Sequence, residues 1–163
     1  MRFLLTAEQR DFARSLDAML TAADTPATVR AWSAGDAGPG RALWSRIAEA
    51  GVFALAAPEE YEGLGPLPVE LALACVELGR HAVPGPLVET VAAAALLARL
   101  AELGQEGPAK RLLPAIVSGA CAASVLFPGA SPYALDADTA DAVLVERRSP
   151  HGSPSAASTT WRP

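Results

Sequence analysis

Charge, aromatic side chains, cysteine and histidine are all scarce in this 163-residue chain. Charged residues make up 19% of it and aromatic residues 6%, and it has two cysteines and two histidines. Cys75 and Cys121 lie far apart and lack the Cys-x-x-Cys spacing, so we expect two reduced thiols in a cytoplasmic protein. With so few nitrogen and sulfur ligands at such separations, we expect no metal site.

Long apolar runs are also missing. The longest, residues 91–98, falls far short of the roughly 18 residues that a membrane span needs. The first ten residues, MRFLLTAEQR, become charged too early for a secretory signal peptide. The net charge of −5 disfavours binding to nucleic acid or to an anionic membrane, because both carry negative charge. We therefore expect a soluble protein with neither as a partner.

Apolar residues are abundant, at 51% of the chain, and most of them are alanine and leucine. This composition favours closely packed helices. Thr6 and Gln9 have the spacing of a capping box at the start of the first helix. Later helices are predicted from Thr25, after a loop at 33–40, over 68–79, over 87–103 and within 107–119.

The segment 68–79 contains only two charged residues, Glu70 and Glu77. They are seven positions apart and lie on one stripe of a helix, so the pattern predicts a helix that is buried on nearly all sides. Carboxylates in such a helix need partners. We expect salt bridges, with Arg80 or Arg99 as the candidate cations, in preference to a catalytic role.

The pattern changes after residue 120. Residues 121–127 and 141–146 are short and β-prone, whereas the tail 147–163 consists mainly of Ser, Pro, Thr and Arg. The fold class is therefore mainly α. We expect a helical bundle over residues 1–119, an incomplete β-sheet segment over 120–146, and a disordered tail over 147–163.

The stretch PEEYEGLG, residues 58–65, could hold a catalytic pair or a phosphate cradle. Nothing in the sequence distinguishes the surroundings of Glu59 from those of Glu60, so we favour a solvated corner over an acid–base pair. The Gly63-Leu64-Gly65 turn lacks a third glycine and a preceding buried strand, which a phosphate-binding loop needs. His81, near a helix end, is expected to have a structural role.

Four segments resemble the N-terminal part of the acyl-CoA dehydrogenase family. They read LTAEQRDFARSL, LWSRIAEAGVFALAAPEEYEGLG, VELALACVELGR and AKRLLPAIVSG. The second is the most specific, because the family typically has Trp, an Ala-Gly turn and then Pro-Glu-Glu-Tyr-Gly-Gly-x-Gly. Position 62 departs from this pattern, since it is glutamate where the family has glycine. The Pro-Gly-Pro turn at 84–86 resembles the divergent actinobacterial branch.

The resemblance implies a helical domain followed by the start of a middle β-domain. It also implies FAD as the cofactor and α,β-desaturation of an acyl-CoA thioester as the reaction. The family's catalytic glutamate lies beyond the part matched here, so we assign no catalytic and no flavin-binding residue. By resemblance, Leu87, Thr90 and Val91 begin the helix that lines the acyl chain.

Three hypotheses follow for function. The first is the N-terminal portion of a flavin-dependent acyl-CoA dehydrogenase, truncated and inactive alone. The second is a non-catalytic helical subunit that pairs with a complete dehydrogenase chain in a homo- or hetero-oligomer. The third is a frame-shifted gene fragment, suggested by the abrupt change of composition at Arg147.

Overall fold

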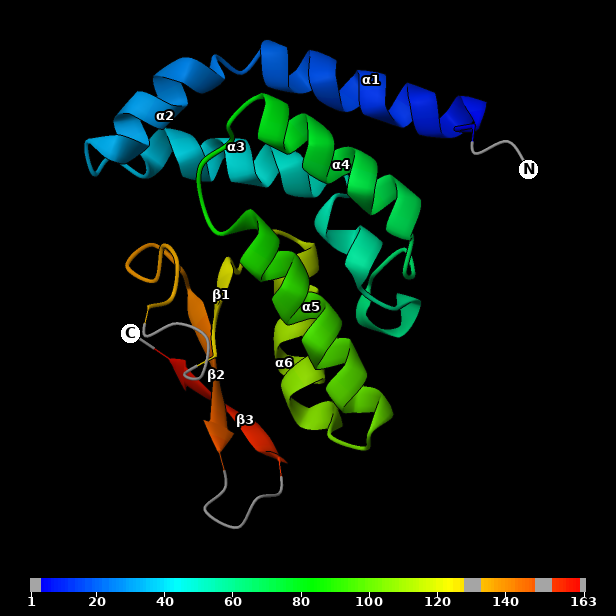
Figure 1. Ribbon diagram of the computed structural model, residues 1–163, viewed down its shortest axis with the longest axis vertical. Helices are drawn as coiled ribbons and strands as arrows, with labels where there is room; N and C mark the ends of the chain where they lie inside the picture. Colours follow the sequence, from blue (N-terminus) through cyan, green and yellow to red (C-terminus); the bar gives the residue numbers. More distant parts are fainter. Residues whose placement is uncertain (1–3, 128–132, 149–153, 162–163) are drawn as a thin grey trace.

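The computed structural model describes residues 4–127, 133–148 and 154–161, with side chains up to Val145. It is mainly α-helical, as predicted (Figure 1). The helices are α1 (Ala7–Thr21), α2 (Thr25–Ser33), α3 (Gly38–Glu49), α4 (Pro68–Arg80), α5 (Leu87–Glu102) and α6 (Glu106–Val117). Two 3-10 turns, η1 (Phe53–Ala56) and η2 (Glu59–Tyr61), connect α3 to α4. The strands are β1 (Ala123–Leu126), β2 (Ala142–Arg148) and β3 (Pro154–Trp161).

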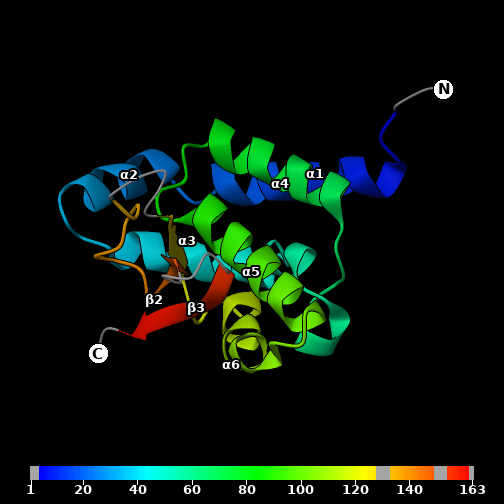
Figure 2. The ribbon, with the colours of Figure 1, turned by 60° about the horizontal axis from the view of Figure 1, so that its bottom comes forward.

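The helices form two groups that share one core. Helix α1 packs along α4, and α5 packs on α6 and against β1 (Figures 1 and 2). The core contains Leu20, Ile47, Phe53, Leu97, Leu113 and Ile116, all of which are buried. Trp44 stacks on Phe53 with ring centroids 4.6 Å apart, so the third helix is fixed to the turn that follows it.

The capping box at the first helix is confirmed. The Thr6 hydroxyl accepts a hydrogen bond from the Gln9 backbone N–H at 3.2 Å, and the Gln9 side chain accepts one from the Thr6 N–H at 2.9 Å. The predicted loop at 33–40 is shorter than expected, because α3 already begins at Gly38 with Pro39 in its first turn. Pro114 lies within α6 and does not divide it.

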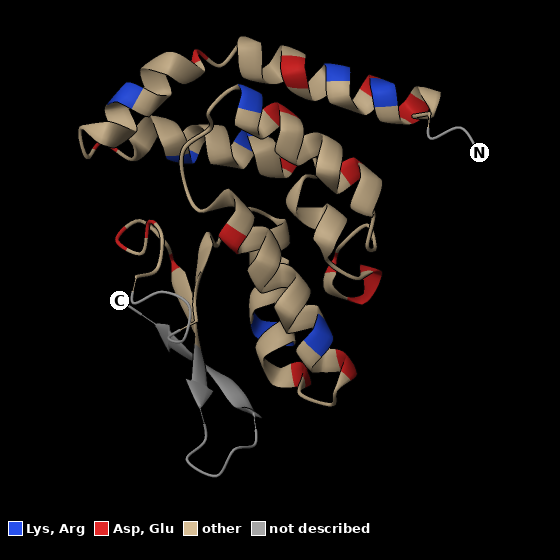
Figure 3. Cartoon of the chain, in the orientation of Figure 1, with Lys and Arg blue, Asp and Glu red and all other residues tan. Residues whose placement is uncertain are grey.

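The prediction that the segment 68–79 is buried on nearly all sides is wrong. Val69 and Val76 on α4 are 45% and 56% exposed, and only Ala74, Glu77 and Leu78 of this helix are buried. The main packing partners of α4 are α1 and η1. Figure 3 shows that α4 and α5 carry few charges, and the exposed residues of α4 include Val69, Ala72 and Val76.

The sheet begins where it was predicted. β1 pairs in parallel with β2, with Ala123 opposite Ala142. The expectation of a disordered tail differs from the structure over 154–161, where the backbone forms β3 and pairs antiparallel with β2. β2 is therefore the middle strand of the sheet, with a backbone partner on each of its two edges.

A clamp formed by Arg41 joins the helices to the sheet. Its guanidinium donates to both Asp141 carboxylate oxygens, at 2.7 and 3.1 Å, and to the carbonyl of Thr139. Asp141 also accepts a hydrogen bond from the Ala122 N–H at 2.8 Å. This bidentate geometry ties α3 to the residues immediately before β1 and β2.

The stretch 58–65 is a corner, as the sequence predicted. The N–H groups of Gly63 and Gly65 donate to the carbonyls of Pro58 and Ala57, at 3.1 and 3.0 Å. Leu64 and Leu67 donate to carbonyls in η1, so this corner directs the chain into α4. Glu59 and Glu60 are exposed and Tyr61 is buried.

Glu62 has a left-handed backbone with φ of +67°, which disfavours a residue with a side chain. We expect Glu62→Gly to stabilise the chain by about 0.5–1 kcal/mol, as measured by urea unfolding. The matched control is Glu60→Gly, which replaces an exposed glutamate at a negative φ two positions earlier and should destabilise. Equal losses of stability in the two variants would contradict this prediction.

Candidate functional site

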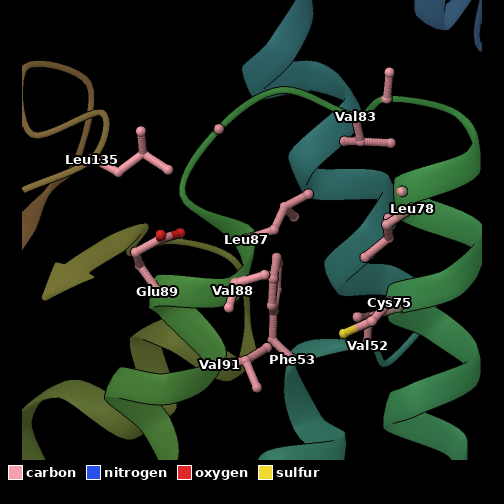
Figure 4. A pocket seen from close by; sticks show the side chains of 13 residues that line it. Val52, Phe53, Cys75, Leu78, Val83, Leu87, Val88, Glu89, Val91 and Leu135 are labelled. Atoms are coloured by element: carbon pink, nitrogen blue, oxygen red, sulfur yellow. The ribbon is translucent and has the colours of Figure 1, made fainter.

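An apolar cavity with a volume of about 250 Å³ lies between α4 and α5 (Figure 4). Its wall from α4 includes Cys75 and Leu78, and its wall from α5 includes Leu87, Val88 and Val91. The other lining residues come from the turn after α3, the connection between α4 and α5, and the loop before β2: Val52, Phe53, Ala82, Val83, Gly85 and Leu135. The lining is therefore almost entirely apolar.

Two aromatic residues support the inner end of this cavity. Phe53 is buried and presents its ring to the cavity, while its other face stacks on Trp44. Gly85, in the connection between α4 and α5, has a φ of +106°. A Cβ atom added at this position would lie 3.5 Å from the nearest ring carbon of Trp44. The positive φ disfavours a side chain at position 85, whereas the contact with Trp44 is an ordinary van der Waals distance.

Of the three residues predicted to line an acyl chain, the structure places two at the cavity. Leu87 and Val91 lie four positions apart on α5, and both line it. Thr90 is buried on another face, where its hydroxyl donates to the Ala123 carbonyl and accepts from the Ala123 N–H, both at 2.9 Å. Its role in this structure is to satisfy the backbone of β1.

Sequence reasoning missed Phe53, Cys75, Leu78 and Val88 as cavity residues. Cys75 and Leu78 are three positions apart and share one face of α4, so a helical-wheel comparison of the two helices could have identified them. No local signal could have identified Phe53. It belongs to η1, about twenty residues before the middle of α4, and only the folding of the chain brings it to the cavity.

The cavity offers little chemistry of its own. Glu89 supplies its single charged group and has no ion pair within the described part of the chain. Partial burial raises the pKa of the Cys75 thiol above its ordinary value, which keeps the thiol protonated and unreactive. Such a surface suits a hydrocarbon group and fixes it by shape.

A flavin does not suit this cavity. The flavin ring and its pyrophosphate need hydrogen-bond donors, whereas the lining is apolar apart from a carboxylate, which accepts hydrogen bonds only when ionised. We therefore derive no step that involves a flavin from these residues.

The other predicted polar residues have structural partners. Glu77 pairs with Arg80 at 2.9 Å, as predicted, whereas the partner of Glu70 is the Gln9 side-chain amide at 3.0 Å and not an arginine. His81 contacts Asp17 through Nε2 at 2.9 Å, which joins the end of α4 to α1. Tyr61 packs against α6, and burial together with the Glu60 carboxylate raises its pKa.

Both cysteines are free, as expected. Burial raises the pKa of the Cys121 thiol to about 11, so this thiol is also protonated at neutral pH. Within the described ranges, none of the helices combines the length and the apolar character that crossing a bilayer requires.

Comparison with known proteins identifies the family. The profile of the acyl-CoA dehydrogenase N-terminal domain matches residues 6–120. The chain is 38% identical over 140 residues to the acyl-CoA dehydrogenase IpdE2 of Mycobacterium tuberculosis. That match covers 84% of this chain but 42% of the relative, so the chain spans less than half of that protein's length.

Solved structures show the same fold. An acyl-CoA dehydrogenase complexed with FAD from Bacillus anthracis superposes with a TM-score of 0.73 at 18% identity, over 96% of this chain and 31% of that one. The ChsE4-ChsE5 complex of Mycobacterium tuberculosis gives a TM-score of 0.65 at 21% identity, over 93% of this chain and 45% of that one. The chain belongs to the acyl-CoA dehydrogenase family, and its residues 6–120 form the N-terminal helical domain of that family.

Proposed function

We propose that this chain provides the acyl-binding wall of a flavin-dependent acyl-CoA dehydrogenase, which desaturates a CoA thioester between its α and β carbons. The observation that carries this proposal is the apolar cavity between α4 and α5. Its volume of about 250 Å³ and its apolar lining suit a hydrocarbon group, and its lone carboxylate is placed at one side. On this proposal residues 120–146 begin a second, β-rich domain in the cytoplasmic enzyme.

In this proposal FAD and the catalytic base come from parts of the enzyme other than the cavity described here. The similar Bacillus anthracis enzyme is complexed with FAD, which supports FAD as the cofactor of the complete assembly. The chain alone would then bind an acyl group without oxidising it. Retention of flavin by the purified chain, with reduction of an electron acceptor on addition of acyl-CoA, would contradict this assignment.

A second candidate function is that of a non-catalytic subunit that pairs with a complete dehydrogenase chain. The outward face of α4, with Val69 and Val76 exposed, favours this alternative, because large apolar side chains at a surface commonly mark protein contacts. A complex of two named chains, ChsE4 and ChsE5, is among the similar structures.

One matched pair of variants distinguishes the two functions. Val88→Trp fills the cavity from its open side, because Val88 lines the cavity and is 66% exposed. Val76→Trp places the same bulk on α4 away from the cavity lining. By calorimetric titration with acyl-CoA, we expect Val88→Trp to lose at least about tenfold in affinity, or about 1.4 kcal/mol, and Val76→Trp to bind normally.

Free CoA is the ligand control for this titration and should not bind, since the cavity recognises the acyl part. Equal binding of CoA and acyl-CoA, or equal losses in the two variants, would contradict the acyl-binding proposal. If the subunit function is correct, Val76→Trp should instead prevent co-purification with a dehydrogenase chain, whereas Val88→Trp should have less effect.

A further inference from the structure

Three metal-ligating side chains meet where α1 lies against α4. Asp17 comes from α1, Glu77 from α4, and His81 from the residue immediately after α4. Asp17 Oδ1 and His81 Nε2 are 2.9 Å apart, and one ligand atom from each of the three residues lies within 4.8 Å of the others. None of these residues takes part in the proposed acyl binding.

The backbone and the core position these three side chains. Glu77 and His81 are four residues apart, so their side chains lie one above the other on the same face of α4. Asp17 is adjacent to Leu16, whose burial fixes the rotation of α1 about its own axis. The Glu77 side chain is only 11% exposed, and a carboxylate with so little access to water needs positive charge close to it.

In the structure, Arg80 supplies that positive charge. Its Nη1 donates to both oxygens of Glu77, at 3.1 and 2.9 Å. The Arg80 side chain is 63% exposed, so it can turn into solvent when another cation takes its place. The bound ion then supplies the positive charge that the buried Glu77 carboxylate needs.

The donors define the class of cation. One imidazole nitrogen with two carboxylates is a ligand set for Zn²⁺ and related first-row ions, whereas Mg²⁺ and Ca²⁺ favour oxygen ligands throughout. His81 also lines an open cavity of about 510 Å³ between α2 and the end of α4, which gives access to solvent. Water from this cavity could occupy the remaining position of a tetrahedral site.

We propose that Asp17, Glu77 and His81 bind a single Zn²⁺ ion that fastens α1 to α4. Helix α1 packs chiefly on α4, so an ion bound at this contact would stabilise the first helix of the domain. On binding, His81 Nε2 and the two carboxylates each give an electron pair to the ion. Any proton held between His81 and Asp17 leaves to solvent.

The test uses the complete chain, freed of metal with a chelator and titrated with Zn²⁺ in a calorimeter. We expect one ion per chain and a higher midpoint of thermal unfolding. Asp17→Asn and His81→Gln should each bind Zn²⁺ at least about tenfold more weakly. Removing a residue that only hydrogen-bonds to a metal ligand already weakens metal binding by about that factor. Glu70→Gln is the matched control, because Glu70 lies on the same helix and bonds to Gln9 outside the cluster.

His151→Gln is a second control, because His151 is the other histidine of the chain. Titration of the unaltered chain with Co²⁺ provides a readout that does not depend on the folding of a variant, since Co²⁺ in a tetrahedral site absorbs visible light much more strongly than Co²⁺ in water. Absence of Zn²⁺ binding, or binding that His81→Gln leaves intact, would overturn the proposal. So would binding that is lost equally on Glu70→Gln or His151→Gln.

Discussion

Replacing Gly63 by alanine is expected to destabilise the chain by about 3 kcal/mol or more, the largest effect that we predict for a single methyl group. A Cβ atom at position 63 would lie 1.9 Å from the carbonyl oxygen of Ala57 and 2.4 Å from its carbonyl carbon. Both are backbone atoms, and the same oxygen accepts the hydrogen bond from Gly65. The corner therefore cannot make room without losing the bonds that form it.

The neighbouring glycine provides a control of a different kind. Gly65 has a φ of +85°, and nothing lies within 4 Å of where its Cβ would be. Gly65→Ala should therefore cost only the roughly 1–2 kcal/mol of left-handed strain, while Gly63→Ala carries the clash. Urea unfolding followed by circular dichroism would measure both. A smaller loss for Gly63→Ala than for Gly65→Ala would show that the corner is less tightly packed than described.

Thr90→Val is expected to cost about 2–4 kcal/mol, although it changes neither the size nor the shape of the side chain much. The Thr90 hydroxyl both donates to and accepts from the backbone of Ala123, and both residues are fully buried. The carbonyl of Ala122 accepts a hydrogen bond from the Ala142 N–H and so points toward β2. The backbone groups of Ala123, the next residue, point to the opposite edge of β1, where the Thr90 hydroxyl bonds to them. Valine would leave a buried N–H and a buried carbonyl unsatisfied.

Thr90→Ser separates the hydrogen bonds from the packing. Serine keeps the hydroxyl and removes one methyl group, so we expect a loss of only about 1 kcal/mol in urea unfolding. Because Thr90 faces β1, both variants should retain acyl-CoA binding at temperatures where they remain folded. Loss of binding by folded Thr90→Val would instead support the expectation, drawn from family resemblance, that Thr90 contacts the acyl chain.

Local signals predicted the helices and the corner well. The capping box at Thr6 and the Pro-Glu-Glu-Tyr corner both depend on neighbouring residues, whose types largely determine the backbone there. The resemblance of these segments to a family was correct for the same reason, because it rests on runs of adjacent residues.

Orientation about a helix axis was predicted less well. On α4 the stripe that carries Glu70 and Glu77 lies against α1, so it does not mark the outward face of the helix. The other positions are nearly all apolar, and nothing in the sequence shows that Val69 and Val76 face outward. The pairing of Thr90 with Ala123 joins residues 33 positions apart, and no local pattern encodes it. The convergence of Asp17 with His81 has the same origin, since only the packing of α1 on α4 brings them together.

The clamp made by Arg41 has a consequence for folding of the chain during its synthesis on the ribosome. Its partner Asp141 lies 100 positions later, so this contact can close only after residue 141 has left the ribosome. Until then the Arg41 guanidinium lacks the carboxylate that it pairs with in the folded chain. A released chain that ends just before residue 141 should accordingly be more sensitive to protease than a released chain that ends a few residues after it.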